Sequence, residues 1–150
     1  MSFEERLTEL GIELPDAPRP MAGYVPAVRS GAQLWIAGQP PGPDWGGGQI
    51  GREYTIEQGA AAARAAGLNI LAQVRQAAGS LDRVRQVVKV VGFVNVAPGM
   101  DQAHRVVNGC SDLMVEVFGD AGRHARSAVG TSTLPMNIPV EIEAVFELEA

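Results

Sequence analysis

The sequence predicts a single α+β domain, residues 1–150, in which two main helices cover one face of one mixed sheet. The chain has 150 residues, enough for one hydrophobic core. Its periodic segments follow in the order helix, strand, strand, helix, strand, helix, strand, strand, without a repeat or linker between them. The last strand is apolar on only one face, so we expect the helices on that face alone.

The N-terminal third predicts a short helix, a hairpin and a loop. Phe3, Leu7 and Leu10 have helical spacing and Gly11 follows them, which is typical of a short amphipathic helix. Two apolar runs between Tyr24 and Gly38 surround Ser30-Gly31 and predict a hairpin. Prolines and glycines fill residues 39–51, which excludes regular structure there, and no GxxxxGK[ST] motif indicates a phosphate site.

The middle of the chain predicts two helices on either side of a central strand. Thr55 and Gln58 form a capping box in front of an alanine-rich helix that ends at Gly79. A short helical turn at 80–84 leads into the β-branched run 87–97, which we expect to be a central strand. A second helix is predicted from about Met100 to Phe118, with its Cys110 facing the core.

Residues 125–150 predict two further strands, joined at 134–137. In the final strand five apolar residues alternate with a face that carries four glutamates: Glu141, Glu143, Glu147 and Glu149. The apolar face belongs under the helices. The opposite face is left open to solvent or to another subunit, and a thin two-layer domain commonly covers such a face by forming oligomers.

Composition excludes several function classes. A formal net charge of −5 disfavours nucleic-acid binding. A single cysteine and the absence of a Cys/His cluster predict neither a disulfide nor a metal site. The acidic N-terminal segment does not look like a signal peptide, and no apolar run reaches the roughly 18 residues of a membrane span. We therefore expect a cytoplasmic protein.

The sequence contains few candidate catalytic residues. Nucleophile-elbow and metalloprotease motifs are missing, and only two histidines are present. His104 reads as a surface residue, and His124 as a turn residue with a local hydrogen bond. Arg126, at the start of a strand, suits either a clamp for a substrate carboxylate or an ion pair with a C-terminal glutamate. Glu141, in the strand predicted beside it, could be that partner or an acid/base group.

Several motifs together resemble the RidA/YjgF/YER057c/UK114 family of reactive-intermediate deaminases, also labelled L-PSP endoribonuclease-like. They are Ala37-Gly38-Gln39-Pro40, Gly79–Val84, Val107-Asn108-Gly109, and Ala125-Arg126-Ser127 followed by Leu134-Pro135 and Val140–Glu143. The extended segment 118–130 is similar to the divergent YjgF branch of the family. The resemblance covers most of the chain.

The resemblance implies a chorismate-mutase-like α+β fold, a homotrimer and active sites in clefts between subunits. It implies a hydrolase without a cofactor that converts 2-aminoacrylate and related 2-imino acids to 2-keto acids and ammonia. In that pattern Arg126 binds the substrate carboxylate, and Glu141 positions or protonates around the attacking water. No metal is needed, because an imine carbon is already electrophilic and placement of one water supplies much of the rate.

The same resemblance places Tyr24, Gly38 and Asn108 around the substrate, and His124 is a further candidate beside Arg126. Two positions depart from the family pattern, where Ala37 and Ala128 replace a serine and a cysteine. The backbone carbonyl of Ala128 could still hold a water. The alternatives are a trimeric protein that binds a small carboxylate, or acts like a chaperone, without turnover, and an endoribonuclease, which the acidic composition disfavours.

Overall fold

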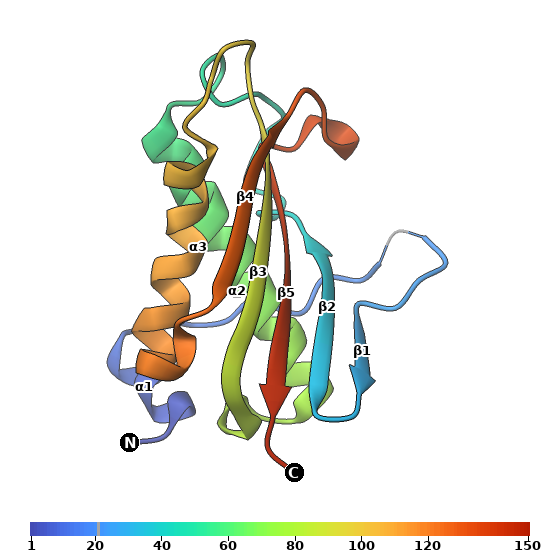
Figure 1. Ribbon diagram of the computed structural model, residues 1–150, viewed down its shortest axis with the longest axis vertical. Coiled ribbons are helices and arrows are strands. Elements are labelled where there is room, and N and C mark those ends of the chain that lie inside the picture. The colour runs from blue at the N-terminus through green and yellow to red at the C-terminus, as the bar shows by residue number, and fades with distance from the viewer. Residues whose placement is uncertain (21) are drawn as a thin grey trace.

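The computed structural model describes residues 1–20 and 22–150, which form two layers, a sheet and the helices that cover it (Figure 1). The elements are α1 (Phe3–Glu9), β1 (Ala27–Ser30), β2 (Gln33–Gln39), α2 (Ile56–Ala78), β3 (Val84–Asn95), α3 (Ala103–Phe118), β4 (Ala125–Thr131) and β5 (Val140–Leu148). This order is the predicted one. The α+β fold class is therefore confirmed.

The five strands lie in the order β1-β2-β5-β3-β4. Only β3 and β4 are parallel, and all other neighbours are antiparallel. Parallel neighbours require a long crossover, which α3 supplies, whereas β5 returns between β2 and β3. The prediction that Glu141 lies in the strand beside that of Arg126 is therefore wrong, because β3 separates β4 from β5.

Local signals set the helix ends. Thr55 and Gln58 form the predicted capping box of α2, and Gly79 ends this helix with φ +90°. Two boundaries differ from the prediction. β3 begins at Val84, three residues earlier than its apolar run, because β5 pairs with it as far as Leu148. Helix α3 begins at Ala103, after a bend around Gly99, whose φ is +83°.

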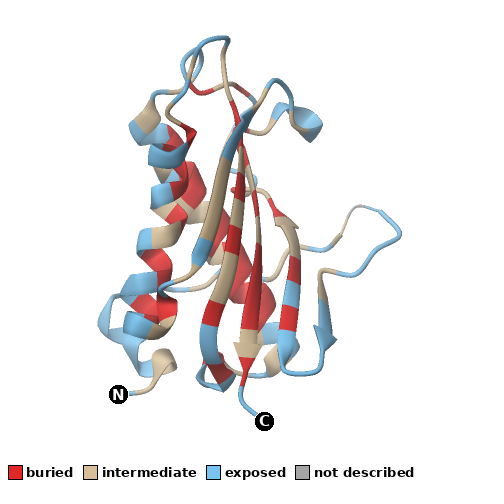
Figure 2. Cartoon of the chain, in the orientation of Figure 1, coloured by how far each residue is buried: buried red, intermediate tan, exposed pale blue. Residues whose placement is uncertain are grey.

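The hydrophobic core lies between the sheet and the two long helices (Figure 2). Along β5 the predicted alternation holds, with Ile142 and Phe146 fully buried against the helices and Glu141 and Glu143 on the other face. The open face also carries Trp35, which is 50% exposed. Cys110 is buried as predicted, and burial raises the pKa of its thiol to about 12.

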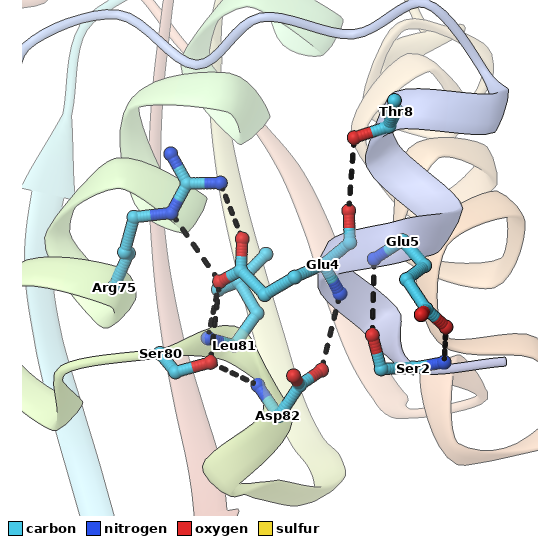
Figure 3. Close-up of polar contacts among 8 residues, drawn as sticks. All are labelled: Ser2, Glu4, Glu5, Thr8, Arg75, Ser80, Leu81 and Asp82. Atoms are coloured by element: carbon cyan, nitrogen blue, oxygen red, sulfur yellow. Dashed lines mark hydrogen bonds and ion pairs between the residues drawn. The ribbon is translucent and has the colours of Figure 1, made fainter.

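Glu4 joins the first helix to the end of α2 (Figure 3). Its carboxylate accepts hydrogen bonds from the Arg75 guanidinium, at 3.3 Å from Nε, and from the Leu81 backbone N–H at 2.8 Å. Burial alone would raise the pKa of Glu4, but these bonds and the charge of Arg75 outweigh burial and lower it. α1 is thus held in place by a charged contact as well as by the buried Leu7.

Candidate functional site

Arg126 points from β4 toward helix α3. Its backbone is in register with Val90 of β3, a fully buried residue on the helix side of the sheet. Its Nη1 donates to Asn108 Oδ1 at 2.7 Å and to Ser111 Oγ at 3.2 Å, and its Nη2 donates to the His104 carbonyl at 3.4 Å. A guanidinium has five N–H donors, so the Nε–H and one Nη2–H have no acceptor among the described residues. These donors can receive a carboxylate.

A chain of hydrogen bonds behind Arg126 fixes the orientation of Ser111. His124 Nδ1 lies 2.7 Å from the Gly122 carbonyl, which can only accept, so Nδ1 carries the proton. Nε2 then accepts from the Ser111 hydroxyl at 2.9 Å, and the Ser111 oxygen is free to accept from Arg126. Burial lowers the pKa of His124, and the charge of Arg126 adds to this effect. His124 therefore supports the arginine as a neutral residue, with the local hydrogen bond that was predicted.

Glu141 lies on the open face of the sheet, next to an irregularity in β2. The register between β2 and β5 shifts between Ile36 and Gln39, which is typical of a β-bulge. At this point a Cβ on Gly38 would lie 2.8 Å from Glu141 Oε2, so only glycine leaves room for the carboxylate. Burial raises the pKa of Glu141, and the neighbouring charge of Glu143 raises it further.

A cavity of about 290 Å³ brings Glu141 together with two other predicted residues, Tyr24 and Gly38. Arg19 lines the same cavity, although the sequence analysis did not single it out. Its signal was its place in the proline-rich segment before Tyr24, but no local pattern indicates which way that segment folds. The cavity thus contains one carboxylate, one phenol and one guanidinium.

The predicted site residues therefore form two groups, and one chain does not bring them together. Arg126, Asn108 and His124 lie at the edge of the sheet on the helix side. Tyr24, Gly38 and Glu141 line the cavity on the other side. None of the ion pairs found among residues 1–20 and 22–150 includes Arg126, so the interpretation of Arg126 as the partner of a C-terminal glutamate is wrong.

The two alanines that depart from the family pattern lie in different places. Ala128 is in register with Gly92 and packs against the core on the helix side. Ala37 lies in the irregular stretch of β2, where its N–H donates to the Pro26 carbonyl at 2.9 Å. Neither side chain can donate or accept a hydrogen bond, so only backbone groups act at these positions.

Similarity to known proteins shows the family of the chain. Residues 4–148 match the model of the family described as "YjgF/chorismate_mutase-like, putative endoribonuclease". The chain belongs to the YjgF/RidA family. Protein TCP17 of Trypanosoma cruzi is 48% identical over 146 residues, which cover 95% of this chain and 91% of TCP17.

Two solved structures extend the YjgF/RidA comparison to three dimensions. A "putative endoribonuclease" from Shewanella oneidensis has a TM-score of 0.95 and 36% identity, covering 99% of this chain and 100% of that one. Atu1372 of Agrobacterium tumefaciens, a protein of unknown function, has a TM-score of 0.88 and 42% identity. The match covers 98% of this chain and 94% of Atu1372. The resemblance to the family that the motifs indicated is confirmed.

The part of the chain that the structure describes offers neither a membrane-spanning helix nor a cluster of metal ligands. No helix there has the length and apolarity to cross a membrane. No group of three or more His, Cys, Asp or Glu side chains within residues 1–20 and 22–150 lies close enough to hold a metal ion.

Proposed function

We propose that the protein is a hydrolase that converts small 2-imino acids, or the enamines that tautomerise to them, into 2-keto acids and ammonia. The observation that carries the proposal is the position of Glu141. Its carboxylate is half-buried, with a raised pKa, above the backbone of Gly38 in a cavity that also contains Tyr24. A carboxylate in such a place can hold and polarise one water molecule.

The hydrolysis of an imine requires only a few groups of the protein. Water adds to the iminium carbon, and one of its protons passes to Glu141. The resulting carbinolamine regains that proton at nitrogen, and the C–N bond breaks with loss of ammonia. The hydroxyl proton is released as the carbonyl forms, and ammonia takes it up to give ammonium. The substrate zwitterion and water thus give a 2-keto carboxylate and ammonium, with no electron transfer and no cofactor in the balance. Placement of the water and one proton acceptor supplies the catalysis.

In this proposal Arg126 holds the substrate carboxylate. Its guanidinium is oriented by Asn108, Ser111 and the His104 carbonyl, and two N–H groups remain for a ligand. Pre-orientation reduces the entropy that the arginine loses when it binds an anion.

Arg126 and Glu141 meet in this scheme only across a subunit boundary. The open face of the sheet, with Trp35 half-exposed, is the surface that a second copy of the chain would cover. We propose a homotrimer with three sites. Each site joins the Arg126 group of one subunit to the Glu141 cavity of its neighbour.

A second candidate is a trimer that binds a small carboxylate without hydrolysing anything. The alanines at positions 37 and 128 favour it, since they remove side-chain hydrogen bonds from both halves of the site. An endoribonuclease is disfavoured by the net charge of −5. If the protein cleaved RNA and the Arg126 and Glu141 variants lost that cleavage, the endoribonuclease would become the favoured candidate.

The test is the rate of keto-acid formation from enzymatically generated 2-aminoacrylate and 2-iminobutyrate. We expect wild type to accelerate it and Arg126→Ala to abolish the acceleration without changing the subunit number. Arg123→Ala is the matched control, because Arg123 is exposed and contacts only Asp120 among the described side chains. An active Arg126→Ala variant would contradict the proposal. An inert wild type that a 2-keto acid protects against heat would establish the binding protein instead.

A further inference from the structure

We infer that the preferred substrates are 2-imino acids with large apolar side chains, because the Glu141 cavity adjoins a second, mostly apolar cavity. This inference rests on the proposed function and specifies its substrate class. The second cavity measures about 590 Å³, and the Glu141 cavity about 290 Å³. The larger one is within the size range of pockets that hold drug-sized ligands.

The two cavities adjoin each other. Pro18, Pro40, Met136 and Ile138 line both of them. A molecule whose polar end lies beside Glu141 can therefore extend into the second cavity without leaving the protein surface. The junction consists of two proline rings and two aliphatic side chains, so a group that passes it encounters apolar atoms.

The walls of the second cavity are mostly apolar, and Asp16 is the charged residue among those that line it. Pro15, Pro43 and Trp45 add to the residues at the junction, and proline has no N–H to offer. Two side-chain amides of α2 donate hydrogen bonds to the backbone carbonyls of the two prolines that line both cavities. Asn69 Nδ2 donates to the Pro40 carbonyl at 2.8 Å, and Gln73 Nε2 donates to the Pro18 carbonyl at 2.6 Å.

These two amides also hold the walls of the second cavity in place. Asn69 is 5% exposed and Gln73 is 2% exposed, in a helix whose other buried residues are apolar or glycine. Buried amides need partners, and here the partners are the segments on either side of the cavity. The proline-rich segments at 15–18 and 40–43 are thereby attached to the long buried helix α2, which favours a pre-formed cavity.

Trp45 supplies the aromatic surface of the second cavity. Its ring lies 5.9 Å from that of Tyr54, at an interplanar angle of 58°. The Tyr54 hydroxyl donates to the Gly46 carbonyl at 2.6 Å, which ties the loop around Trp45 to a residue two positions before the start of α2. The indole is thus positioned by contacts outside the cavity, and its remaining surface is available to a ligand.

Met136 lies at the junction in a backbone conformation that non-glycine residues rarely adopt. Its φ is +55°, and that of Asn137 is +57°. Asn95 Nδ2 donates to Asn137 Oδ1 at 2.9 Å, and the Gly48 N–H donates to the Asn137 carbonyl at 2.8 Å, so neighbouring segments enforce this turn. Such strain concentrates at functional positions. Met136 remains 68% exposed, and its flexible thioether can adapt to side chains of different shape.

These features define the substrate. Its carboxylate and imine belong in the polar cavity, and its side chain belongs in the apolar one. One methylene in a hydrophobic pocket changes kcat/KM by about tenfold or more. Imines derived from leucine or phenylalanine should therefore be hydrolysed with a kcat/KM at least about tenfold above that of the imine derived from alanine.

The test compares these three imines, generated from the amino acids by an amino-acid oxidase, with wild type and two variants of one position. We expect Trp45→Phe to keep the preference and Trp45→Gln to reduce it by about tenfold. If Trp45→Gln does not fold, Met136→Gln serves as the second variant, with the same expected loss. Equal or faster hydrolysis of the alanine-derived imine by wild type would overturn the inference while leaving the proposed function intact.

Calorimetric binding of pyruvate and of phenylpyruvate separates the two hypotheses further, because it needs no turnover. If no imine is hydrolysed but phenylpyruvate binds about tenfold more tightly than pyruvate, the hydrolase proposal fails and the apolar preference stands. Tighter binding of phenylpyruvate should be lost in Trp45→Gln. Sedimentation measures the subunit number of Trp45→Gln. If this variant has an altered subunit number and an unchanged ligand preference, the cavity is a contact between copies and the inference is wrong.

Discussion

Arg126 and Glu141 lie on opposite faces of the sheet, on strands that β3 separates. Arg126 is in register with the buried Val90, and Glu141 with Phe93 of the same strand. Because side chains three residues apart on a strand point to opposite faces, no rotamer change brings the two charges together within one chain. A site that uses both residues has to be built from two subunits.

Mixed oligomers test this geometry directly. Arg126→Ala and Glu141→Gln proteins should each be inactive, but trimers reassembled from a 1:1 mixture should recover about a quarter of wild-type activity. Each boundary has one chance in four of joining an intact Arg126 to an intact Glu141. The measurement is keto-acid formation after joint refolding. Mixtures of Arg126→Ala with the double variant contain no intact Arg126, so they are the control and should stay inactive. If the 1:1 mixture of the two single variants also stays inactive, the two residues do not act across a boundary.

Glu143 should tune the pH dependence through Glu141. The negative charge of Glu143 contributes to the raised pKa of Glu141, second to burial. If ionised Glu141 accepts a proton from water, kcat/KM rises with pH through that pKa. Glu143→Gln removes the repulsion, lowers the pKa and moves this acidic limb to lower pH. A pH profile of both proteins checks the shift, and a limb that stays in place would show that Glu141 does not control the rate.

Arg19 offers a rival position for the substrate carboxylate, since it lines the cavity that contains Glu141. If Arg126 is the clamp, Arg126→Lys should raise KM about tenfold or more, because lysine cannot form the two parallel hydrogen bonds of a guanidinium. Arg19→Lys should then change KM less than threefold. The reverse ranking would assign carboxylate binding to Arg19 and would place the whole site within one subunit.

Glu4 should contribute to stability only when it is ionised. Its pKa is lowered in the folded protein from an ordinary value of 4.5, so its contribution is complete above that pH and disappears as pH falls through the lowered pKa. Glu4→Gln should cost about 1 kcal/mol at pH 7, given partial solvent screening. Denaturant unfolding at pH 7 and near pH 3 measures this, with Glu13→Gln as the exposed control. A cost that does not shrink in acid would argue against an ionic contact.

Gly109 should tolerate no side chain. A Cβ there would overlap the backbone carbonyl of Ala60, which lies on the facing helix α2. Gly109→Ala should therefore lower the free energy of unfolding by about 2 kcal/mol or more, despite the higher helix propensity of alanine. Gly23→Ala is the control, because a Cβ at Gly23 would meet nothing within 4 Å. Equal thermal stability of the two variants would contradict the close packing of α2 on α3.

Most of the secondary structure could be predicted because the signals for it are local. Thr55 with Gln58 marks the start of α2, Gly79 marks its end, and the alternation from Val140 to Leu148 marks a strand with one apolar face. The two boundaries that were misplaced, at the starts of β3 and α3, are set by a partner strand and by a bend. The residues at these two boundaries do not themselves determine where β3 and α3 begin.

The candidate site was predicted only as a set of residues. The motifs named Arg126, Glu141, Tyr24, Gly38 and Asn108, but no motif showed that β3 would lie between Arg126 and Glu141. For Arg19 the only signal was its place in a proline-rich segment, and Met136 lies in a short connection between strands. Neither segment has a periodicity that indicates how it folds. Only the tertiary structure brings them to the cavity that they line.

The sequence by itself determined the elements, the apolar face of each and the family, because these depend on residues close together in the chain. The tertiary structure decided which strand lies beside which, and so which charged groups can meet. Strand order depends on how the long helix α3 crosses over between β3 and β4, a long-range contact that no local pattern encodes. Arg126 and Glu141 were both evident in the sequence, but the strand between them is a property of the fold.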